Sequence, residues 1–313
     1  MSFFDVYDLK SIENLDLLAR KVVEGFIIGL HKSPFHGFSV EFAEHRLYNS
    51  GESTKNLDWK IYARTDKLFV KKYEEETNLR CQIVLDSSSS MLFPKDLKIK
   101  NLTLNKFQYS ALGAASLMNL LKRQRDAFGL SLFDTKLKIH TPNKSSSTHY
   151  KLLLSYLENE IQSAALEQTA DIPATLHQIA DRVHKRSLII IFSDFFDRAE
   201  DHDELYSALQ HLNYNKHEVV VFHVMDEPLE MAFEFENRPH LFVDMETGEQ
   251  IKLQSNELKS AYQAKVKERQ DRIIQKCLQY KIDYVPTNIR NGYHEVLRRY
   301  LTKRSKILSL IHI

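Results

Sequence analysis

Hydrophobic positions recur at helical spacing between residues 11 and 30, in the stretch SIENLDLLARKVVEGFIIGL. Apolar residues three and four apart predict an amphipathic helix there, with Ser11, Glu13 and Asn14 as candidate capping residues. Farther along, apolar residues alternate through Leu68, Val70 and Tyr73, which is typical of a half-exposed strand. Residues 1–77 hold few apolar runs suited to a core, so we expect them to pack as a helix and extended strands on the rest of the chain.

From residue 79 onward, short continuous apolar runs alternate with helical patterns. Continuous apolar runs are typical of parallel strands that are buried on both faces. Such strands are predicted in RCQIVLD, DAFGLSLFD, RSLIIIFSDFFD and HEVVVFHVMD. The short alternating segment TKLKIHT fits an antiparallel edge strand. The alternation of strands and helices predicts an α/β fold, a doubly wound and mostly parallel sheet with flanking helices and right-handed crossovers.

The pattern changes again after the fourth of these strands. Alternating positions from Leu229 to Leu253, with ETGE as the turn, predict a hairpin insertion. A long charged helix, a final short strand in IDYVPT and a closing helix follow. We place one boundary, near residue 78. It separates an N-terminal helix and extended-strand segment (1–77) from a domain (78–313) that contains the hairpin insertion at about 229–253.

Composition narrows the class of protein. With 313 residues, of which 43% are hydrophobic, the chain can bury a sizeable core. Its 43 basic and 42 acidic residues nearly cancel, which argues against a general binder of nucleic acid or of membrane surfaces. Two cysteines, one of them inside an apolar run, do not suggest a disulfide framework. Since no secretory signal is recognisable and no apolar run is long enough to span a bilayer, we expect a soluble, cytoplasmic protein.

Oxygen-bearing side chains follow two of the predicted core strands, at the point where each strand ends. Asp86, Ser88 and Ser90 follow the first strand, and Asp194 follows the third. Thr169 lies between them in the sequence, in a loop just before a predicted helix. Sites of open parallel sheets form beyond the carboxyl ends of the strands, where crossovers leave on opposite faces. Two carboxylates and three hydroxyls are hard oxygen ligands, so these five residues predict a site for Mg²⁺ or Mn²⁺.

This arrangement resembles the metal-ion-dependent adhesion site of von Willebrand factor A domains. That site combines an Asp-x-Ser-x-Ser sequence, a Thr on a later loop and an Asp after a buried strand. The family often has a Gly shortly before the Thr, whereas here Glu167 stands two residues before Thr169. Thr148 or Thr175 could fill the same role. The resemblance implies a von Willebrand factor A-like fold with a metal-dependent protein-binding site.

The chain also resembles, more narrowly, the bacterial domain-of-unknown-function family 58. Members carry a Tyr-x-x-Gly-(Asp/Glu) piece, an Asp-Trp-Lys, an Ala-Arg-Thr and a Lys-x-Tyr-Glu-x-Glu ahead of Asp-x-Ser-x-Ser-Met. The corresponding residues here are Tyr48, Gly51 and Glu52, Asp58 to Lys60, Ala63 to Thr65, and Lys72 to Glu76. The C-terminal stretch IDYVPTNIRNGYHEVLRRYLTKR is similar as well. The resemblance implies a cytoplasmic A-domain protein that partners a MoxR-type AAA+ ATPase in the maturation or assembly of other proteins.

Other interpretations stay open for the same residues. Ser and Asp also cap helices and stabilise turns, and Thr169 could simply cap the helix that begins near Asp171. A metal-dependent hydrolase or phosphatase could use this end of the sheet, although a dehalogenase-like phosphatase needs a second Asp where Ser88 stands. A scaffold with an unoccupied site is the third alternative. We expect no enzyme activity, but metal-dependent capture of an acidic residue on a protein partner, the AAA+ ATPase or its client.

Overall fold

In the computed structural model, the chain divides into two compact units. Gly29–Asn78 forms one unit, and Met1–Ile28 together with Leu79–Ile313 forms the other. The structure describes residues 14–31, 45–47, 59–66, 68–71, 79–95, 98–99, 102–163, 171–195, 203–214, 216–245, 248–294 and 296–302. The larger unit contains the candidate site.

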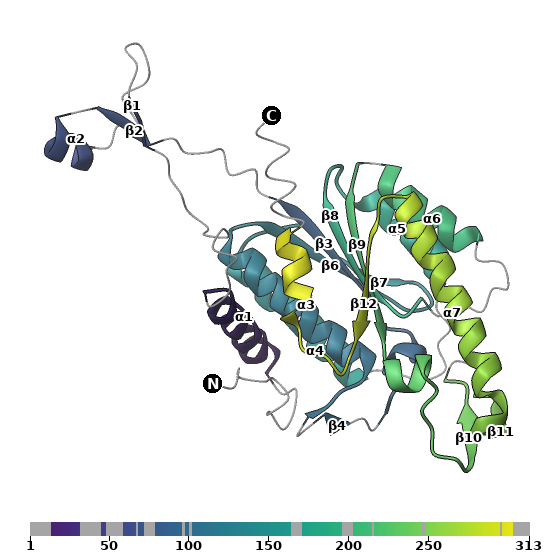
Figure 1. The fold of residues 1–313 in the computed structure, drawn as a ribbon. Coiled ribbons are helices and arrows are strands. Elements are labelled where there is room, and N and C mark those ends of the chain that lie inside the picture. Colours follow the sequence, from purple (N-terminus) through teal and green to yellow (C-terminus); the bar gives the residue numbers. More distant parts are fainter. Residues whose placement is uncertain are drawn as a thin grey trace. The chain divides into compact units, whose positions relative to one another are not determined.

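A six-stranded sheet, in the order β12-β9-β8-β3-β6-β7, forms the centre of the larger unit (Figure 1). Its strands are β3 (Arg80–Asp86), β6 (Ala127–Phe133), β7 (Leu137–His140), β8 (Leu188–Ser193), β9 (Glu218–Met225) and β12 (Asp283–Asn288). Neighbouring strands run parallel, except that β7 pairs antiparallel with β6 at one edge. The predicted α/β fold of von Willebrand factor A type, with a mostly parallel sheet and an antiparallel edge strand, is confirmed.

Burial explains why the two central strands are continuous apolar runs in the sequence. All six residues of β8 are buried, and so is every residue of β3 after Arg80. Their parallel register pairs Ile83 with Ile190, so the two strands also end side by side. At the far edge, β12 pairs with β9 and contains an exposed proline, Pro286.

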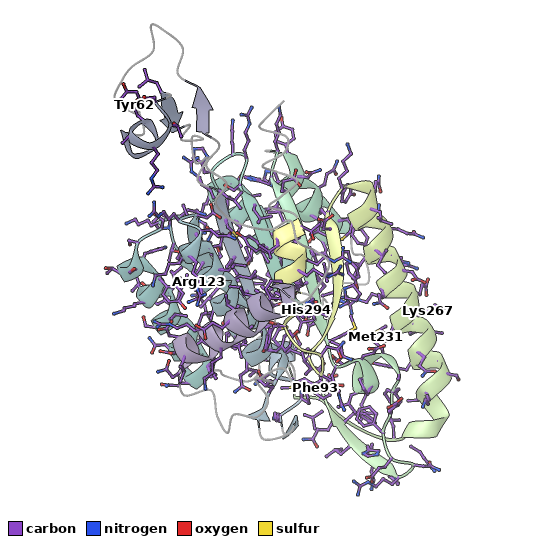
Figure 2. The ribbon with its side chains drawn as sticks, turned by 60° about the vertical axis from the view of Figure 1, so that its left-hand side comes forward. Tyr62, Phe93, Arg123, Met231, Lys267 and His294 are labelled. Carbon is purple, nitrogen blue, oxygen red and sulfur yellow. The ribbon has the colours of Figure 1, made fainter. Side chains whose placement is uncertain are left out.

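Helices cover both faces of the sheet (Figure 1). On one face α3 (Lys106–Arg123) packs against α4 (Ser147–Ser163), and on the other α5 (Ile172–Arg182) packs against α6 (Asp203–Tyr214) beside α7 (Ser255–Gln279). Figure 2 shows Lys267 on the outer side of α7, in keeping with the predicted charged helix. No helix in the described part of the chain is long and apolar enough to cross a membrane.

The N-terminal helix α1 (Leu15–His31) packs on this unit through polar contacts as well as its apolar face. Asn14 caps the helix by accepting a hydrogen bond from the Leu17 N–H at 2.9 Å. The Tyr150 hydroxyl on α4 donates to Asp16 Oδ1 at 2.9 Å. The predicted helix is therefore present, and its described part begins where the Asn14 cap stands.

The stretch from 229 to 253 contains a hairpin of β10 (Pro239–Val243) and β11 (Gln250–Gln254), which pair antiparallel. The residues before the hairpin are not extended. They form a π-helical turn, η4 (Glu227–Met231), because Pro228 fixes its start and Asp226 accepts a capping hydrogen bond from the Leu229 N–H at 3.4 Å. An alternating sequence thus contains a helical turn as well as two strands.

The smaller unit is described in part. Strands β1 (His45–Leu47) and β2 (Phe69–Lys71) pair antiparallel, and helix α2 (Trp59–Thr65) lies between them in the sequence. The extended segment near residue 70 agrees with the prediction, but the sequence pattern did not indicate the helix. Trp59–Thr65 includes the good helix formers Lys60, Ala63 and Arg64, and its described side chains are exposed, so no apolar periodicity marks it.

Candidate metal centre

The two oxygen-rich strand ends meet at the point where the sheet changes winding direction. From β3 the chain crosses to β6 on one side, and it later returns to β8 on the other side of β3. At such a switch point the loops after the two strands leave on opposite faces and open a crevice between them. Asp86 ends β3, and Ser193 ends β8 with Asp194 directly after it. The fold therefore brings these residues to one place.

Asp86 is the innermost acidic residue of this centre, with none of its surface exposed. Its Oδ1 accepts a hydrogen bond from the Ser88 N–H at 2.9 Å. Its Oδ2 accepts one from the Ser193 hydroxyl at 2.6 Å, and the Ser193 Oγ in turn accepts from the Phe195 N–H at 2.9 Å. Both oxygens of Asp86 thus bond to neutral donors from β3's own loop and from the neighbouring strand.

The serine run after Asp86 is an ordered turn. Ser88 precedes a short 3-10 helix, η3 (Ser89–Leu92), whose residues Met91 and Leu92 are buried. These apolar side chains anchor the turn on the core, and the Ser88 carbonyl accepts from the Met91 N–H at 3.1 Å. The hydroxyls of Ser88 and Ser90 lie 3.1 Å apart. Two hydroxyl oxygens are therefore held next to the Asp86 carboxylate.

A buried lysine accompanies Asp194. Lys106, the first residue of α3, places Nζ 2.7 Å from Asp194 Oδ2 and 2.5 Å from Glu230 Oε1. Burial by itself would lower the pKa of the Lys106 ammonium, but the charges of Asp194 and Glu230 raise it above its ordinary value. Lys106 is thus a permanent cation within the centre.

Glu230 reaches the centre from η4 and is fixed there by a second charge pair. Its Oε2 accepts a hydrogen bond from the Asp226 N–H at 2.6 Å. The fully buried Asp226 carboxylate accepts from Arg290 Nε at 2.9 Å and from its terminal nitrogen at 3.1 Å. This bidentate pair ties the start of η4 to the loop after β12, so Glu230 has a rigid support.

Charge in the centre is unevenly balanced. The group of Asp86, Asp194, Glu230 and Lys106 has three carboxylates and one ammonium, which contacts Asp194 and Glu230. Burial, and then the charge of Asp194, raise the pKa of Asp86 to about 6. A hard divalent cation would offset the repulsion between Asp86 and Asp194, and the nearby hydroxyls are suitable further ligands. The chemistry of these side chains therefore fits Mg²⁺ or Mn²⁺.

A protein-family model matches the part of the chain that contains the candidate centre. The family model described as "Protein of unknown function DUF58" matches residues 44–272. The chain belongs to this family. The matched segment contains the serine turn, and Asp86, Lys106, Asp194 and Glu230 all lie inside it.

Relatives of this DUF58 protein carry no functional names. It is 22% identical over 185 residues to "Uncharacterized protein Rv1480" of Mycobacterium tuberculosis (strain ATCC 25618 / H37Rv), covering 59% of this chain and 56% of the relative. "Uncharacterized protein Mb1516" of Mycobacterium bovis matches to the same extent. The chain spans about half the length of these curated relatives.

Solved structures resemble the fold at low identity. BatB from Bacteroides thetaiotaomicron, a conserved hypothetical protein, aligns with 19% identity and a TM-score of 0.47, over 74% of this chain and 99% of BatB. An aerotolerance-related membrane protein from Bacteroides fragilis aligns with 17% identity and a TM-score of 0.44, over 72% and 99%. The VWA domain of SpRpn10 aligns with 10% identity and a TM-score of 0.38, over 71% and 94%. Function therefore has to be argued from the residues of the DUF58 centre itself.

The structure places four of the five predicted ligands at this centre. Asp86, Ser88 and Ser90 lie in one turn, and the charge of Asp194 acts on Asp86. Thr169 lies outside the described residues. Within the described part of the chain, no group of three or more His, Cys, Asp or Glu side chains is arranged to hold a metal ion. A cation here would therefore depend on hydroxyl ligands as well as on carboxylates.

One of the two alternative threonines, Thr148, lies away from the centre. Thr148 is exposed at the start of α4, and its neighbour His149 places Nε2 3.0 Å from the carbonyl oxygen of Phe128, near the beginning of β6. That is the opposite end of the sheet from Asp86, which pairs with the last residue of β6. Thr175 is buried in the first turns of α5. Thr148 is thus too far from the centre to act as a ligand.

Sequence reasoning missed Lys106, Glu230 and His223 as members of the centre. His223 Nε2 lies 3.0 Å from the Asp194 carbonyl oxygen, and burial lowers the pKa of His223 to about 4. The His223 imidazole is therefore uncharged and lines the site. The sequence did offer a signal for Lys106, because this lysine stands directly before the apolar helix pattern. That helix begins at the same edge of the sheet as the predicted site. The sequence offers no comparable signal for Glu230.

Proposed function

We propose that this DUF58 protein is a non-enzymatic protein-binding module that captures an acidic side chain of its partner in a metal-dependent manner. Mg²⁺ or Mn²⁺ would be held by Asp86, Ser88, Ser90, Thr169 and Asp194. The observation that supports this most is the buried Asp86, which lies close enough to Asp194 for the second charge to raise its pKa. Lys106 already offsets the charge of Asp194, whereas Asp86 bonds neutral donors, and a buried carboxylate is costly without a cation beside it.

The residues of the centre would have different roles in the proposed metal site. Asp86 and Asp194 would supply negative charge, directly or through water, and the three hydroxyls would supply neutral ligands. The bound divalent cation would contribute positive charge and a coordination position that an incoming carboxylate can fill. Ser193 and the Ser88 N–H orient Asp86, because each bonds one of its two oxygens. The buried Met91 and Leu92 keep the serine turn in place.

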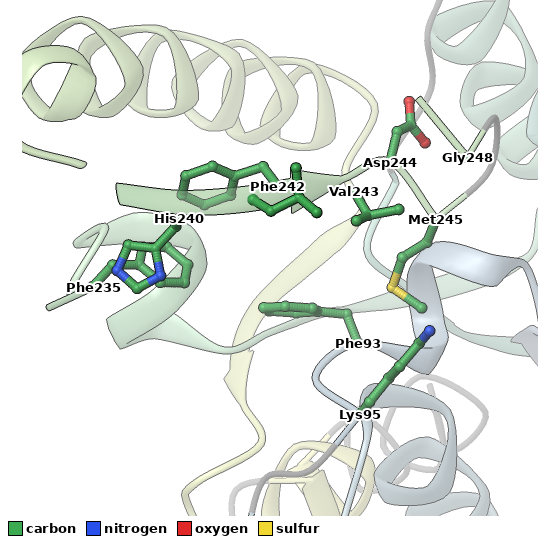
Figure 3. Close-up of a pocket in the computed structure, with 10 residues that line it drawn as sticks. Phe93, Lys95, Phe235, His240, Phe242, Val243, Asp244, Met245 and Gly248 are labelled. Carbon is green, nitrogen blue, oxygen red and sulfur yellow. The ribbon is translucent and has the colours of Figure 1, made fainter. Parts of the chain in front are cut away.

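The surface beside the centre has the character of a protein-binding surface. A cavity of about 390 Å³ lies between Phe93, just after the serine turn, and three residues in and around β10, namely Phe235, Phe242 and Met245 (Figure 3). On the hairpin and at the start of α7, large apolar side chains are exposed, among them Leu241, Val243, Ile251 and Leu258. Ile251 pairs with Phe242, whereas Leu241 and Val243 alternate with it along β10, so both faces of the hairpin offer apolar side chains to a partner.

The family resemblance indicates which partner to test. We propose a cytoplasmic MoxR-type AAA+ ATPase, or a client protein that the two mature or assemble together. The direct experiment is calorimetry of the purified MoxR-type ATPase with this protein, in Mg²⁺ and in chelator. Asp86→Ala removes a carboxylate from the centre, and Asp181→Ala removes an exposed carboxylate from α5 as the matched control.

We expect binding in Mg²⁺ by the wild type and by Asp181→Ala, and at least about tenfold weaker binding in chelator or with Asp86→Ala, since loss of one of two charged ligands weakens a divalent site. Equal affinity under all four conditions would show that binding uses another face. A phosphatase and esterase screen in Mn²⁺ tests the non-enzymatic part of the proposal, and turnover that disappears in Asp86→Ala would overturn it.

A further inference from the structure

Lys106 occupies an unusual position for a cation. Its side chain is 2% exposed, and it stands at the first residue of α3, where the helix dipole disfavours positive charge. Two carboxylates compensate, because Nζ lies 2.7 Å from Asp194 Oδ2 and 2.5 Å from Glu230 Oε1. On a further side, Nζ lies 5.8 Å from the centroid of the Phe93 ring. The ammonium is therefore enclosed, and one of its two carboxylate partners, Asp194, is a predicted metal ligand.

We propose that Lys106 is a built-in competitor of the divalent cation at this centre. Without metal its ammonium neutralises Asp194, and binding of the divalent cation requires Lys106 to shift from Asp194 to Glu230 alone. This inference rests on the proposed function and specifies how its metal site is regulated. Lys106 thereby sets the metal affinity without being a ligand.

Electrostatics gives the reason for competition. Two cations that share one carboxylate repel each other, and burial reduces the screening of that repulsion by water. Lys106 bonds a carboxylate oxygen of Asp194, which would also be a metal ligand. Removing the lysine charge should therefore strengthen metal binding. A purely structural role for Lys106 predicts the opposite, because a loosened centre would bind metal less well.

Glu230 makes the shift of Lys106 feasible. Its carboxylate is fixed by the Asp226 N–H, and Asp226 is held by Arg290, so Glu230 stays in position whether or not Asp194 is available. Lys106 can thus leave Asp194 without losing every partner for its charge. Removing the charge of Glu230 should hold Lys106 more firmly on Asp194 and take away a nearby negative charge. Both effects should weaken metal binding.

The experiment is a titration with Mn²⁺ alone, followed by the electron paramagnetic resonance signal of the free ion. Wild type is compared with Lys106→Met and Glu230→Gln. Lys122→Met is the matched control, since it makes the same change near the other end of α3, about 24 Å away along the helix axis. Lys106→Gln keeps polar contacts without the charge and serves if the methionine variant does not fold, as judged by circular dichroism.

We expect Lys106→Met to bind Mn²⁺ at least about tenfold more tightly than wild type, equivalent to about 1.4 kcal/mol. Glu230→Gln should bind severalfold more weakly, and Lys122→Met like wild type. Unchanged or weaker binding by both Lys106 variants, with a wild type that binds, overturns this inference and leaves the proposed function intact. No binding by any variant overturns both. Binding only without Lys106 supports the inference and overturns metal capture by the wild type.

Discussion

The Ser193 hydroxyl donates a 2.6 Å hydrogen bond to the Asp86 carboxylate, across the boundary between β8 and β3. This contact links the two strand ends at the switch point of the sheet. It also lowers the pKa of Asp86, opposing the effect of burial. The orientation and charge of the innermost carboxylate therefore depend on a neutral side chain that the metal-site motif does not include.

Replacing that side chain tests its importance. Ser193→Ala should destabilise the fold by about 1 kcal/mol through the lost hydrogen bond. It should also weaken Mn²⁺ binding severalfold, because Asp86 loses its orientation. Ser116→Ala is the matched control, since it removes an equally buried hydroxyl that donates to Leu112 O inside α3. The measurements are urea unfolding and Mn²⁺ titration, and equal Mn²⁺ affinities for the two variants would contradict the assigned role.

Loss of a charged ligand should weaken metal binding more than loss of a neutral ligand. Asp86→Ala removes one of two ligand charges and should abolish measurable Mg²⁺ binding, whereas Thr169→Ala removes a neutral ligand and should cost about tenfold or less. Isothermal calorimetry with Mg²⁺ compares the two variants, and circular dichroism verifies that both remain folded. A Thr169→Ala defect as large as that of Asp86→Ala would mean that Thr169 does more than supply a neutral hydroxyl.

Gly129 lies in β6 where no side chain fits. A Cβ at this position would lie 2.5 Å from Gln82 Oε1 on β3 and 2.7 Å from the Thr141 carbonyl oxygen. Gly129→Ala should therefore destabilise the protein by about 1–3 kcal/mol. Gly292→Ala is the control, because a Cβ there meets no atom within 4 Å. Urea unfolding measures both, and a stability loss of similar size in the two variants would count against the close contact at β6.

His217 should make stability depend on pH. Its Nδ1 accepts a 3.2 Å hydrogen bond from the Ser187 N–H, and burial lowers the pKa of the imidazole. In the unfolded chain the pKa returns to about 6.5, so the unfolded state takes up a proton first as the pH falls. The stabilising effect is thus present above about pH 6.5 and is lost below it, with a slope of at most about 1.4 kcal/mol per pH unit.

His217→Asn tests this dependence, because its side-chain oxygen can accept the Ser187 hydrogen bond but does not titrate. The free energy of unfolding in urea, measured at about pH 7 and about pH 5, should fall less in the variant than in the wild type. Part of the loss will persist, since the pKa of His149 is lowered by burial as well. An equal loss in both proteins would exclude His217 as a source of acid sensitivity.

The sequence predicted the sheet well because local pattern and burial agree there. Continuous apolar runs at β3 and β8 required burial on both faces, and this placed Asp86 and Asp194 at one edge. The lysine and glutamate of the centre could not be found in this way. Lys106 and Glu230 are 124 positions apart, and their contact depends on how η4 folds back over the start of α3. The helical turn itself was hidden in an alternating stretch, where Pro228 and the Asp226 cap override the strand pattern.

Both outer strands of the six-stranded sheet are poor templates for an added strand. β7 is four residues long, and β12 has Pro286, which lacks the N–H that a further strand would need. Extended peptides commonly bind by adding a strand at a sheet edge. A protein that recognises this domain is therefore directed away from the sheet edges, toward side chains displayed by loops, helices and the hairpin.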